Sequence, residues 1–370
     1  MNEDYRDITL LECNSLVLGE LPKGCTMCRR GEKAVIFITG LCPVNCFYCP
    51  ISFDRKGKDV IYVNEARIRN VSEAIDEIEK TKALGCSITG GEPLVVFDRV
   101  IRFIVALKDH FGSQFHIHLY TSAYKMSKDH IRMLDKSGLD EIRFHIVYYR
   151  STLKAIEFTV KNTHMDVGVE IPVIPGKGRF YKGLLKTLDN IGVKFINLNE
   201  LEITESNYNR ILLRGFEAKK DYTISVKGSK ELALELITWA KNNIKHINVH
   251  YCSALFKDAI QTRRRLLRSS LFVRKVYEDI TEDGTLRKLV IKGPKHILDH
   301  IKIILSRELG EGNTELVIRN QCYELHTSIH SLRILRRLNP KIKQYITVFE
   351  IEEYPTSDRI RVIEEPCILE

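Results

Sequence analysis

Several features that would assign a chain of 370 residues to a special class are missing from this sequence. No apolar run approaches the roughly 20 residues that a membrane-spanning helix needs, so we expect no membrane contact. Residues 1–7 are polar and acidic, which is not typical of a signal peptide. We find no repeat at solenoid spacing and no low-complexity tract. The composition, with 44% hydrophobic residues, instead predicts a folded chain with a sizeable core.

Cysteine is also scarce, because ten residues in a chain of this length are too few for a disulfide scaffold. The cysteines are clustered, and clustering in a chain without disulfides indicates metal binding. A reduced metal centre requires a reducing compartment, and we therefore expect a cytoplasmic protein.

The charge is unbalanced, with a net value of +9 and a pI near 8.9. Much of the excess lies in residues 257–277, which contain seven basic side chains and one acidic one. Such a segment could hold a phosphate backbone, or it could be the solvated face of a helix. The basic residues are Lys257, Arg263, Arg264, Arg265, Arg268, Arg274 and Lys275.

Strand and helix patterns alternate through the first half of the chain. We expect strands at 33–40, 85–89, 115–122, 141–147, 167–174 and 195–202. Helices are expected between them at 64–83, 98–110, 127–137, 151–162 and 181–191. A helix at 229–243 and a strand at 246–252 extend this set. Right-handed crossovers between parallel strands would curl it into a partial (βα)6 barrel of the TIM type.

The pattern of expected strands and helices changes after residue 256. A turn at Asp283-Gly284, a helix at 294–309, a strand at 314–325, a further helix and a last strand near 345–351 predict a small α+β appendage. The expected division is an N-terminal cysteine-bearing extension (1–32), the partial barrel (33–256), a basic linker (257–277) and the α+β domain (278–370).

Three cysteines, Cys42, Cys46 and Cys49, have the spacing C-x3-C-x2-C in a loop that follows a predicted strand. Barrel enzymes place their chemistry at this end of the strands. A [4Fe–4S] cluster is usually held by four thiolates, so three thiolates would leave one iron open to a small molecule. Buried thiols and a partial zinc site are the alternatives.

A second signature, Gly90-Gly91-Glu92-Pro93, ends the next strand. Two glycines permit close approach of the backbone to a ligand, and the proline fixes the turn. Together with the cysteine motif and the aromatic Tyr48 before Cys49, this segment resembles the radical SAM superfamily. The addition of Cys25-x2-Cys28 makes the chain similar to archaeal proteins related to the pyruvate formate-lyase activating enzyme. The resemblance covers about residues 1–205.

The resemblance implies a partial barrel, a [4Fe–4S] cluster held by Cys42, Cys46 and Cys49, and S-adenosylmethionine (SAM) on the open iron. It also implies that the segment Gly90–Pro93 binds the amino group of SAM, with Glu92 supplying charge. An electron from a ferredoxin- or flavodoxin-like donor would cleave SAM to a 5′-deoxyadenosyl radical, which abstracts hydrogen from a substrate. Whether SAM is consumed or regenerated stays open.

Polar residues at the ends of later strands are further candidates for cofactor contacts, because strand ends face the ligand in such barrels. An arginine can form a bidentate contact with a carboxylate, and polar residues in a buried strand require partners or a cavity. These candidates are Thr121, Ser122, Arg143, His145, Asn197 and Asn199.

The pair Cys25 and Cys28, with Cys13 upstream and Cys252 at the end of a late strand, predicts an auxiliary metal site. The expected metal is a second [4Fe–4S] cluster or zinc, and free thiols in a turn are the alternative.

Three substrate classes are compatible with the motifs. We rank an RNA base first because of the basic segment, then a protein or peptide substrate, including a glycyl-radical enzyme, and then a small molecule. A non-catalytic iron–sulfur or zinc protein that binds nucleic acid is the remaining class, and the Gly-Gly-Glu-Pro segment disfavours it.

Overall fold

The computed structural model describes residues 6–219 and 225–369, and the chain divides into two compact units. The first unit comprises Met1–Glu79 and Ala83–Thr262, and the second comprises Lys80–Lys82 and Arg263–Glu370. Each unit contains its own cluster of buried apolar side chains.

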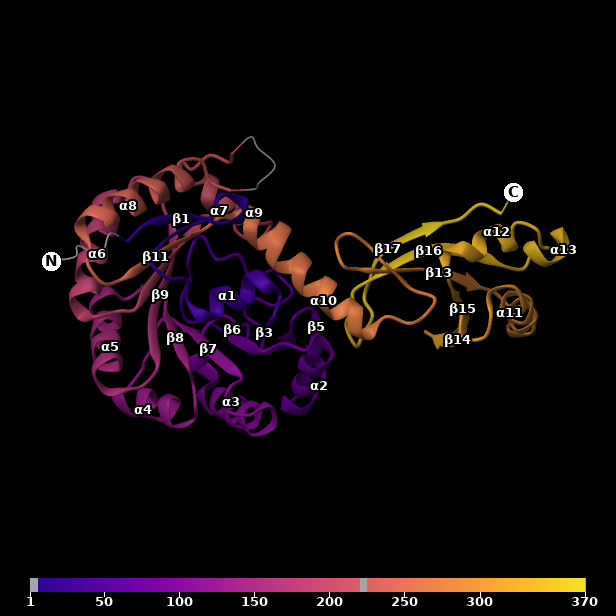
Figure 1. Ribbon diagram of the computed structural model, residues 1–370, viewed down its shortest axis with the longest axis horizontal. Helices are drawn as coiled ribbons and strands as arrows, with labels where there is room; N and C mark the ends of the chain where they lie inside the picture. Colours follow the sequence, from indigo (N-terminus) through magenta and orange to yellow (C-terminus); the bar gives the residue numbers. More distant parts are fainter. Residues whose placement is uncertain (1–5, 220–224, 370) are drawn as a thin grey trace. The chain divides into compact units, whose positions relative to one another are not determined.

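The first unit is built on an eleven-stranded sheet, shown in Figure 1, whose strand order is β1-β2-β11-β10-β9-β8-β7-β6-β3-β4-β5. Its seven central strands are parallel to one another, and parallel neighbours require crossover connections. The six expected strands and the added seventh are therefore confirmed. They are β3 (Lys33–Phe37), β6 (Gly85–Thr89), β7 (His116–Thr121), β8 (Glu141–Phe144), β9 (Asp166–Val173), β10 (Phe195–Glu200) and β11 (Asn248–Cys252).

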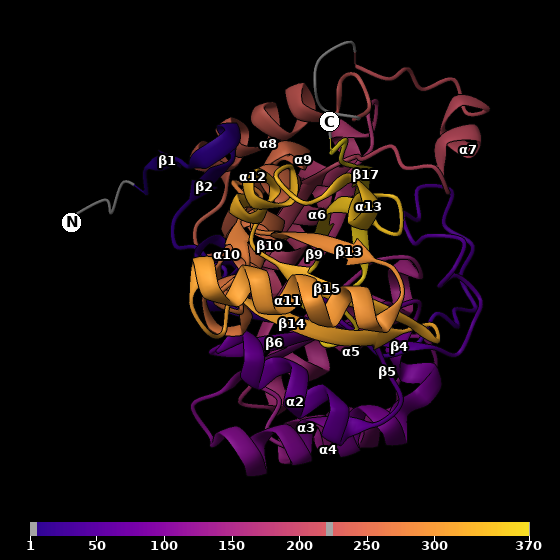
Figure 2. The ribbon, with the colours of Figure 1, turned by 90° about the vertical axis from the view of Figure 1, so that its right-hand side faces the viewer.

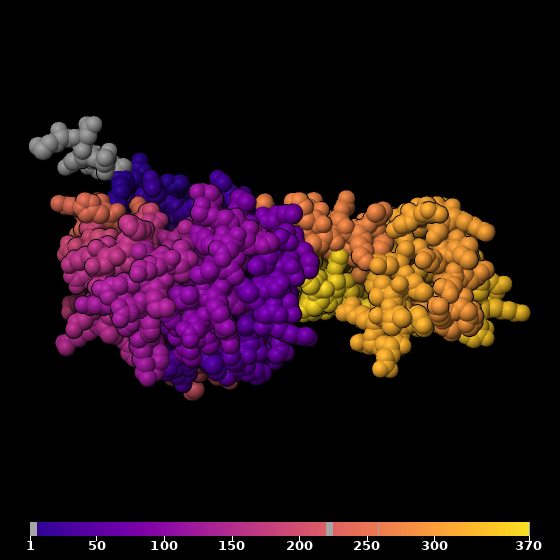
Figure 3. All heavy atoms as spheres, turned by 90° about the horizontal axis from the view of Figure 1, so that it is seen from below, coloured from indigo at the N-terminus to yellow at the C-terminus, as the bar shows by residue number. Residues whose placement is uncertain are grey.

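Helices pack on the outer face of this curved sheet and bury its apolar side chains (Figure 1). In the space-filling view of Figure 3, the violet and magenta segments form a continuous surface. The sheet ends in antiparallel strands at both edges and does not close. The fold is thus a partial TIM-like barrel, as expected. The outer helices are α2 (Val71–Thr81), α3 (Phe97–Phe111), α4 (Lys128–Lys136), α5 (Tyr149–Asn162), α6 (Gly178–Ile191) and α8 (Ser229–Asn243).

The edge hairpin β4 (Ile61–Val63) and β5 (Ala66–Ile68) corrects the prediction of a helix that begins at residue 64. Asn64 adopts a positive φ of 55°, which fits the two-residue turn of a hairpin and not a helix. Its side-chain oxygen accepts a hydrogen bond from the Val35 amide at 2.9 Å. The helical period is present only from Val71 onward.

The N-terminal residues form a second edge hairpin, β1 (Ile8–Leu10) and β2 (Leu16–Leu18), with the short helix η1 (Glu12–Asn14) between the strands. β2 pairs antiparallel with β11. The next helix, α1 (Lys23–Arg30), lies inside the curve of the sheet (Figure 1). A side chain at Gly24 would collide there with Arg143 of β8 and His118 of β7. The helix therefore fills the base of the barrel interior.

Short elements surround the open end of the barrel. They are the turn η2 (Pro93–Val96), the helices α7 (Tyr208–Leu212) and α9 (Ala254–Phe256), and the π-helix η3 (Lys257–Thr262). The segment predicted as a basic linker is helical over most of its length, because η3 is followed directly by α10 (Arg263–Val273).

The second unit is a mainly antiparallel sheet with one long helix, α11 (Lys295–Leu309), along one face, as Figure 2 shows. The expected strand at 314–325 is wrong as a single element, because Asn320 and Gln321 both have positive φ and form a tight turn. Two short helices, α12 (Leu332–Leu335) and α13 (Pro340–Lys343), complete the unit. Its strands are β12 (Asp279–Ile280), β13 (Leu286–Lys292), β14 (Thr314–Arg319), β15 (Cys322–Thr327), β16 (Thr347–Glu353) and β17 (Arg361–Pro366).

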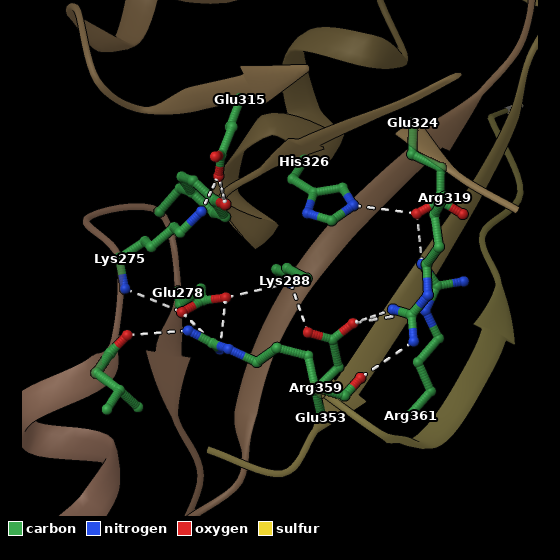
Figure 4. Close-up of polar contacts among 12 residues, drawn as sticks. Lys275, Glu278, Lys288, Glu315, Arg319, Glu324, His326, Glu353, Arg359 and Arg361 are labelled. Carbon is green, nitrogen blue, oxygen red and sulfur yellow. Dashed lines mark hydrogen bonds and ion pairs between the residues drawn. The ribbon is translucent and has the colours of Figure 1, made fainter. Parts of the chain in front are cut away.

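A network of buried ion pairs covers one face of this second sheet (Figure 4). Lys288, which is almost fully buried, bonds to Glu353 at 2.7 Å and to Glu278 at 3.2 Å. Arg359 and Arg319 bind the same two carboxylates from other elements. Each charge has a partner of opposite sign, which offsets the loss of hydration on burial.

None of the helices in the described part of the chain has the length and apolar character that crossing a bilayer requires.

Candidate active site

A cavity of about 460 Å³ opens at the carboxyl ends of the parallel strands of the first unit. Its volume lies in the range of small-molecule sites. The sequence-predicted candidates for the main site all line it, although they come from five separate segments. These residues are Cys42, Cys46, Tyr48, Cys49, Gly90, Gly91, Glu92, Pro93, Thr121, Ser122, Arg143, His145, Asn197 and Asn199. Of the auxiliary set, Cys25, Cys28 and Cys252 also line the cavity.

The loop that carries Cys42, Cys46 and Cys49 is fixed by contacts with distant segments. Arg210 of α7 donates to the Cys46 carbonyl oxygen at 2.9 Å, and Asn207 donates to the Tyr48 carbonyl oxygen at 3.0 Å. The Phe47 ring stacks on Phe216 with centroids 6.0 Å apart. These contacts hold residues 46–48 of the loop in place.

The thiols have the chemistry of metal ligands. Burial raises the pKa of Cys42 and Cys46, so both stay protonated at neutral pH until a metal displaces the proton. Among residues 6–219 and 225–369, no three His, Cys, Asp or Glu side chains converge on one point as a site for a single ion. In a [4Fe–4S] cluster each thiolate binds a different iron, so the three ligands are spread around the cluster.

The segment Gly90-Gly91 packs directly against the cysteine loop. The Gly91 amide donates to the Thr39 carbonyl oxygen, and the Glu92 amide donates to that of Leu41, both at 2.8 Å. A Cβ atom on Gly91 would lie 2.3 Å from the Leu41 oxygen and 2.9 Å from Cys42 Cβ. Only glycine allows this approach, so the two signatures form one structural unit.

The Glu92 carboxylate is 1% exposed and accepts four hydrogen bonds. Leu94 N and Thr121 Oγ1 donate to Oε1 at 3.1 and 2.7 Å, and Ser122 N and Oγ donate to Oε2 at 2.7 and 2.5 Å. Thr121 and Ser122 therefore hold Glu92 in place, which the sequence did not indicate. Glu92 in turn ties the end of β6 to the end of β7.

Tyr48 and His145 connect the cysteine loop to the barrel interior. His145 Nδ1 lies 3.0 Å from the Glu170 carbonyl oxygen, which can only accept, so Nδ1 carries the proton. Nε2 then accepts from the Tyr48 hydroxyl at 2.8 Å. Burial lowers the pKa of His145, which keeps the ring neutral and preserves this arrangement.

Arg143 is 2% exposed and is bound by protein carboxylates. Its guanidinium donates to Glu141 at 2.5 Å and to Glu170 at 2.8 Å. Asn197 and Asn199 donate to the two oxygens of Glu170 at 2.7 and 2.9 Å. The expected contact of Arg143 with the SAM carboxylate would have to compete with Glu141 and Glu170. The two asparagines share the inner face of β10, as their spacing implies.

Sequence reasoning missed two contributors to the site. Lys257 lines the cavity and pairs with Glu202. Desolvation lowers the pKa of this lysine, but the Glu202 carboxylate outweighs it, so the pKa lies above its usual range. Arg210 holds the cysteine loop from a position far along the chain. The sequence gave a signal only for Lys257, which lies soon after a predicted strand. It gave none for Arg210, because pairing between residues far apart in the chain leaves no local pattern.

Comparison with known proteins is consistent with this geometry. The family model of the Radical SAM superfamily matches residues 36–167. A curated protein of Methanocaldococcus jannaschii, named as a glycyl-radical enzyme activating enzyme, is 39% identical over 362 residues, which cover 94% of this chain and 93% of that protein.

Similar solved structures include SuiB of Streptococcus suis bound to S-adenosylmethionine, with 12% identity, a TM-score of 0.45, and coverage of 61% of this chain and 52% of that chain. The radical SAM methyltransferase TsrM from Kitasatospora setae has 12% identity and a TM-score of 0.39, with 70% and 55% coverage. The chain thus spans about half the length of these two structures.

Proposed function

This chain belongs to the radical SAM superfamily, and from that premise we propose that it is an activating enzyme that abstracts hydrogen from a glycine residue of a partner protein. The observation that carries the proposal is the 39% identity, over nearly the whole of both chains, to a protein named for this activity. A reductant of the ferredoxin or flavodoxin type would be the second partner.

The site fits the cofactors that the family implies. When bound, a [4Fe–4S] cluster supplies the electron that cleaves SAM to the 5′-deoxyadenosyl radical. Cys42, Cys46 and Cys49 would hold that cluster, and the cavity beside them can contain SAM. Because Gly90 and Gly91 lack side chains, the end of β6 lies against the cysteine loop. The backbone of these glycines would therefore contact a ligand that the loop holds.

The rest of the cavity can orient a polypeptide segment. Apolar side chains such as Val44, Val147 and Ile171 line it beside the amides of Asn197 and Asn199. Glu170 keeps these amides in fixed positions. Apolar side chains of this kind help to exclude water from a reactive radical, and fixed amides can recognise a backbone.

The structure gives less support to an RNA base as the substrate, which we ranked first from the sequence. Basic side chains of the segment 257–277 bind protein groups: Arg263 the Glu282 carbonyl oxygen, Arg268 the Lys82 carbonyl oxygen, and Lys275 the Glu315 carboxylate. These contacts indicate that much of the charge stabilises the fold.

The test uses deuterium transfer. Protein extract from cells grown on glycine deuterated at Cα is incubated anaerobically with reconstituted enzyme, SAM and dithionite. We expect 5′-deoxyadenosine that carries deuterium, detected by mass spectrometry, and no product with Cys42→Ala. The control is extract from unlabelled cells.

RNA from cells grown in deuterated medium is tested in parallel. If 5′-deoxyadenosine carries deuterium only when the RNA fraction is added, the proposal is contradicted and RNA is supported as the substrate. Unlabelled 5′-deoxyadenosine in every reaction would also contradict it, because SAM would then be cleaved without abstraction from glycine.

A further inference from the structure

Four cysteines that the proposed function does not use lie on three elements of the first unit that contact one another. Cys13 lies in η1, Cys25 and Cys28 in α1, and Cys252 at the end of β11. Cys25 and Cys28 are three residues apart on a helix and so share one face. Both line the reaction cavity together with Cys252.

Two contacts join η1, which contains Cys13, to α1 and to the end of β11. Glu12, the residue before Cys13, forms an ion pair at 2.7 Å with Arg29, the residue after Cys28. Ser253, the residue after Cys252, donates from its hydroxyl to the Cys13 carbonyl oxygen at 2.8 Å. The three elements therefore meet through the immediate neighbours of the cysteines.

The backbone at Cys13 is strained, which indicates that its position is enforced. Cys13 and Asn14 have φ values of 52° and 59°, a conformation that is uncommon for residues other than glycine. Strain of this kind persists where surrounding contacts hold it, and it is frequent at ligand clamps.

One buried hydrogen-bond donor lies beside these cysteines. The Nη2 atom of Arg143 is buried and has no hydrogen-bond partner among the residues that the structure describes. It lies against the first turn of α1, because a Cβ atom on Gly24 would be 2.7 Å away from it. Lys257, which is partly exposed and paired with Glu202, lines the same cavity. An unpaired guanidinium N–H beside Cys25 would be satisfied by a sulfur ligand of negative charge.

We propose that Cys13, Cys25, Cys28 and Cys252 ligate a second iron–sulfur cluster, fully held by thiolates, in the wall of the reaction cavity. Structural zinc sites also use four cysteines, and the metal count below distinguishes zinc from iron. With the fourth ligand supplied by the protein, this cluster has no open iron and would not bind SAM. The proposal goes beyond the proposed function and does not depend on it.

The test counts metal in a variant that lacks the first cluster. Cys42, Cys46 and Cys49 are replaced by alanine, and the full chain is reconstituted anaerobically with iron and sulfide. We expect this triple variant to retain about half of the wild-type iron and sulfide, or about four irons per chain. Its absorption and Mössbauer spectra should be those of a [4Fe–4S] cluster. No partner protein is needed, so the result is independent of the glycine-abstraction test.

Addition of Cys25→Ala and Cys28→Ala to the triple variant should remove the remaining iron. The matched control adds Cys322→Ala and Cys367→Ala, which delete the same number of thiols from the second unit and should leave the iron in place. Circular dichroism reports whether each variant is folded. Cys13→Ser and Cys252→Ser, each in the triple variant, should lower the iron content as well.

Two results would overturn the proposal. Loss of all iron from a folded triple variant would mean that the chain holds a single cluster. One zinc and no iron in that variant, measured by mass spectrometry of the metals, would identify a zinc site instead.

Discussion

Glu170 is the residue through which most polar groups of the cavity are connected. Its carboxylate binds Arg143, Asn197 and Asn199, and its carbonyl oxygen accepts from His145. Burial alone would raise the pKa of Glu170, but Arg143 and the two asparagines lower it to about 2. The group is therefore ionised at any pH at which the protein would work.

This lowered pKa predicts a pH dependence of stability. A carboxyl group with a folded pKa of about 2 and an ordinary value of 4.5 stabilises the fold above pH 4.5 and loses that contribution as the pH falls toward 2. We expect Glu170→Gln to lower the free energy of unfolding of the iron-free protein at pH 7 by roughly 3 kcal/mol. The difference from wild type should shrink between pH 4.5 and pH 2. Urea unfolding followed by fluorescence measures it.

The control is Glu205→Gln, at an exposed position of the same unit, which should change the free energy of unfolding little. An equal loss of stability at pH 7 and pH 2 would show that Glu170 acts through packing and not through its charge.

At the residue scale, the sequence revealed the groups whose signal is local. Cysteine spacing and Gly90-Gly91 marked the loop and the turn, because metal ligands and close backbone approach need those residue types at those positions. The partners of these groups were not predictable. Glu92 is bound by Thr121 and Ser122, and Tyr48 by His145, and such pairs depend on which strands lie side by side.

At the scale of elements, β6 and the cysteine loop act as one unit because Gly91 lets them touch. We expect Gly91→Ala to weaken SAM binding by about tenfold or more, since the added Cβ must push Leu41 and Cys42 away. Equilibrium dialysis of reconstituted enzyme with labelled SAM, together with an iron count, measures the effect.

Gly183→Ala is the matched control, because a Cβ at this position in α6 meets nothing within 4 Å. It should leave SAM binding unchanged. Wild-type affinity in Gly91→Ala would show that the cysteine loop can move without consequence.

Among the elements, the apolar periodicity of the sequence predicts some helices and strands and misses others. The parallel strands and outer helices followed from apolar patterns, because each buries a continuous face. The hairpins β4–β5 and β14–β15 were mispredicted because their turns use Asn64, Asn320 and Gln321, with no glycine in the turn. Residues other than glycine with positive φ leave little trace in a sequence.

At the scale of the whole molecule, two cores predict two unfolding transitions. Removal of the buried Lys288 would leave Glu278 and Glu353 without their central cation. We expect Lys288→Ala to destabilise the second unit by about 3–5 kcal/mol and to lower only its transition temperature in calorimetry. Iron removal should lower only the other transition.

Lys302→Ala, at an exposed position on α11, is the control and should leave both transitions in place. A single transition that shifts with both treatments would show that the two units unfold together.

The pairing of β2 with β11 has a consequence for synthesis on the ribosome. β2 is made early, but its partner strand follows about 230 residues later. At 5–20 residues per second, roughly 10–50 s pass before that edge can pair. Until β11 has been synthesised, the β2 edge of the hairpin lacks this neighbour, and Cys13 cannot approach Cys252. Asn207 and Arg210, which hold the Cys42 loop, are made about 40 residues before β11. A nascent chain can therefore complete the contacts of this loop before β2 obtains its partner strand.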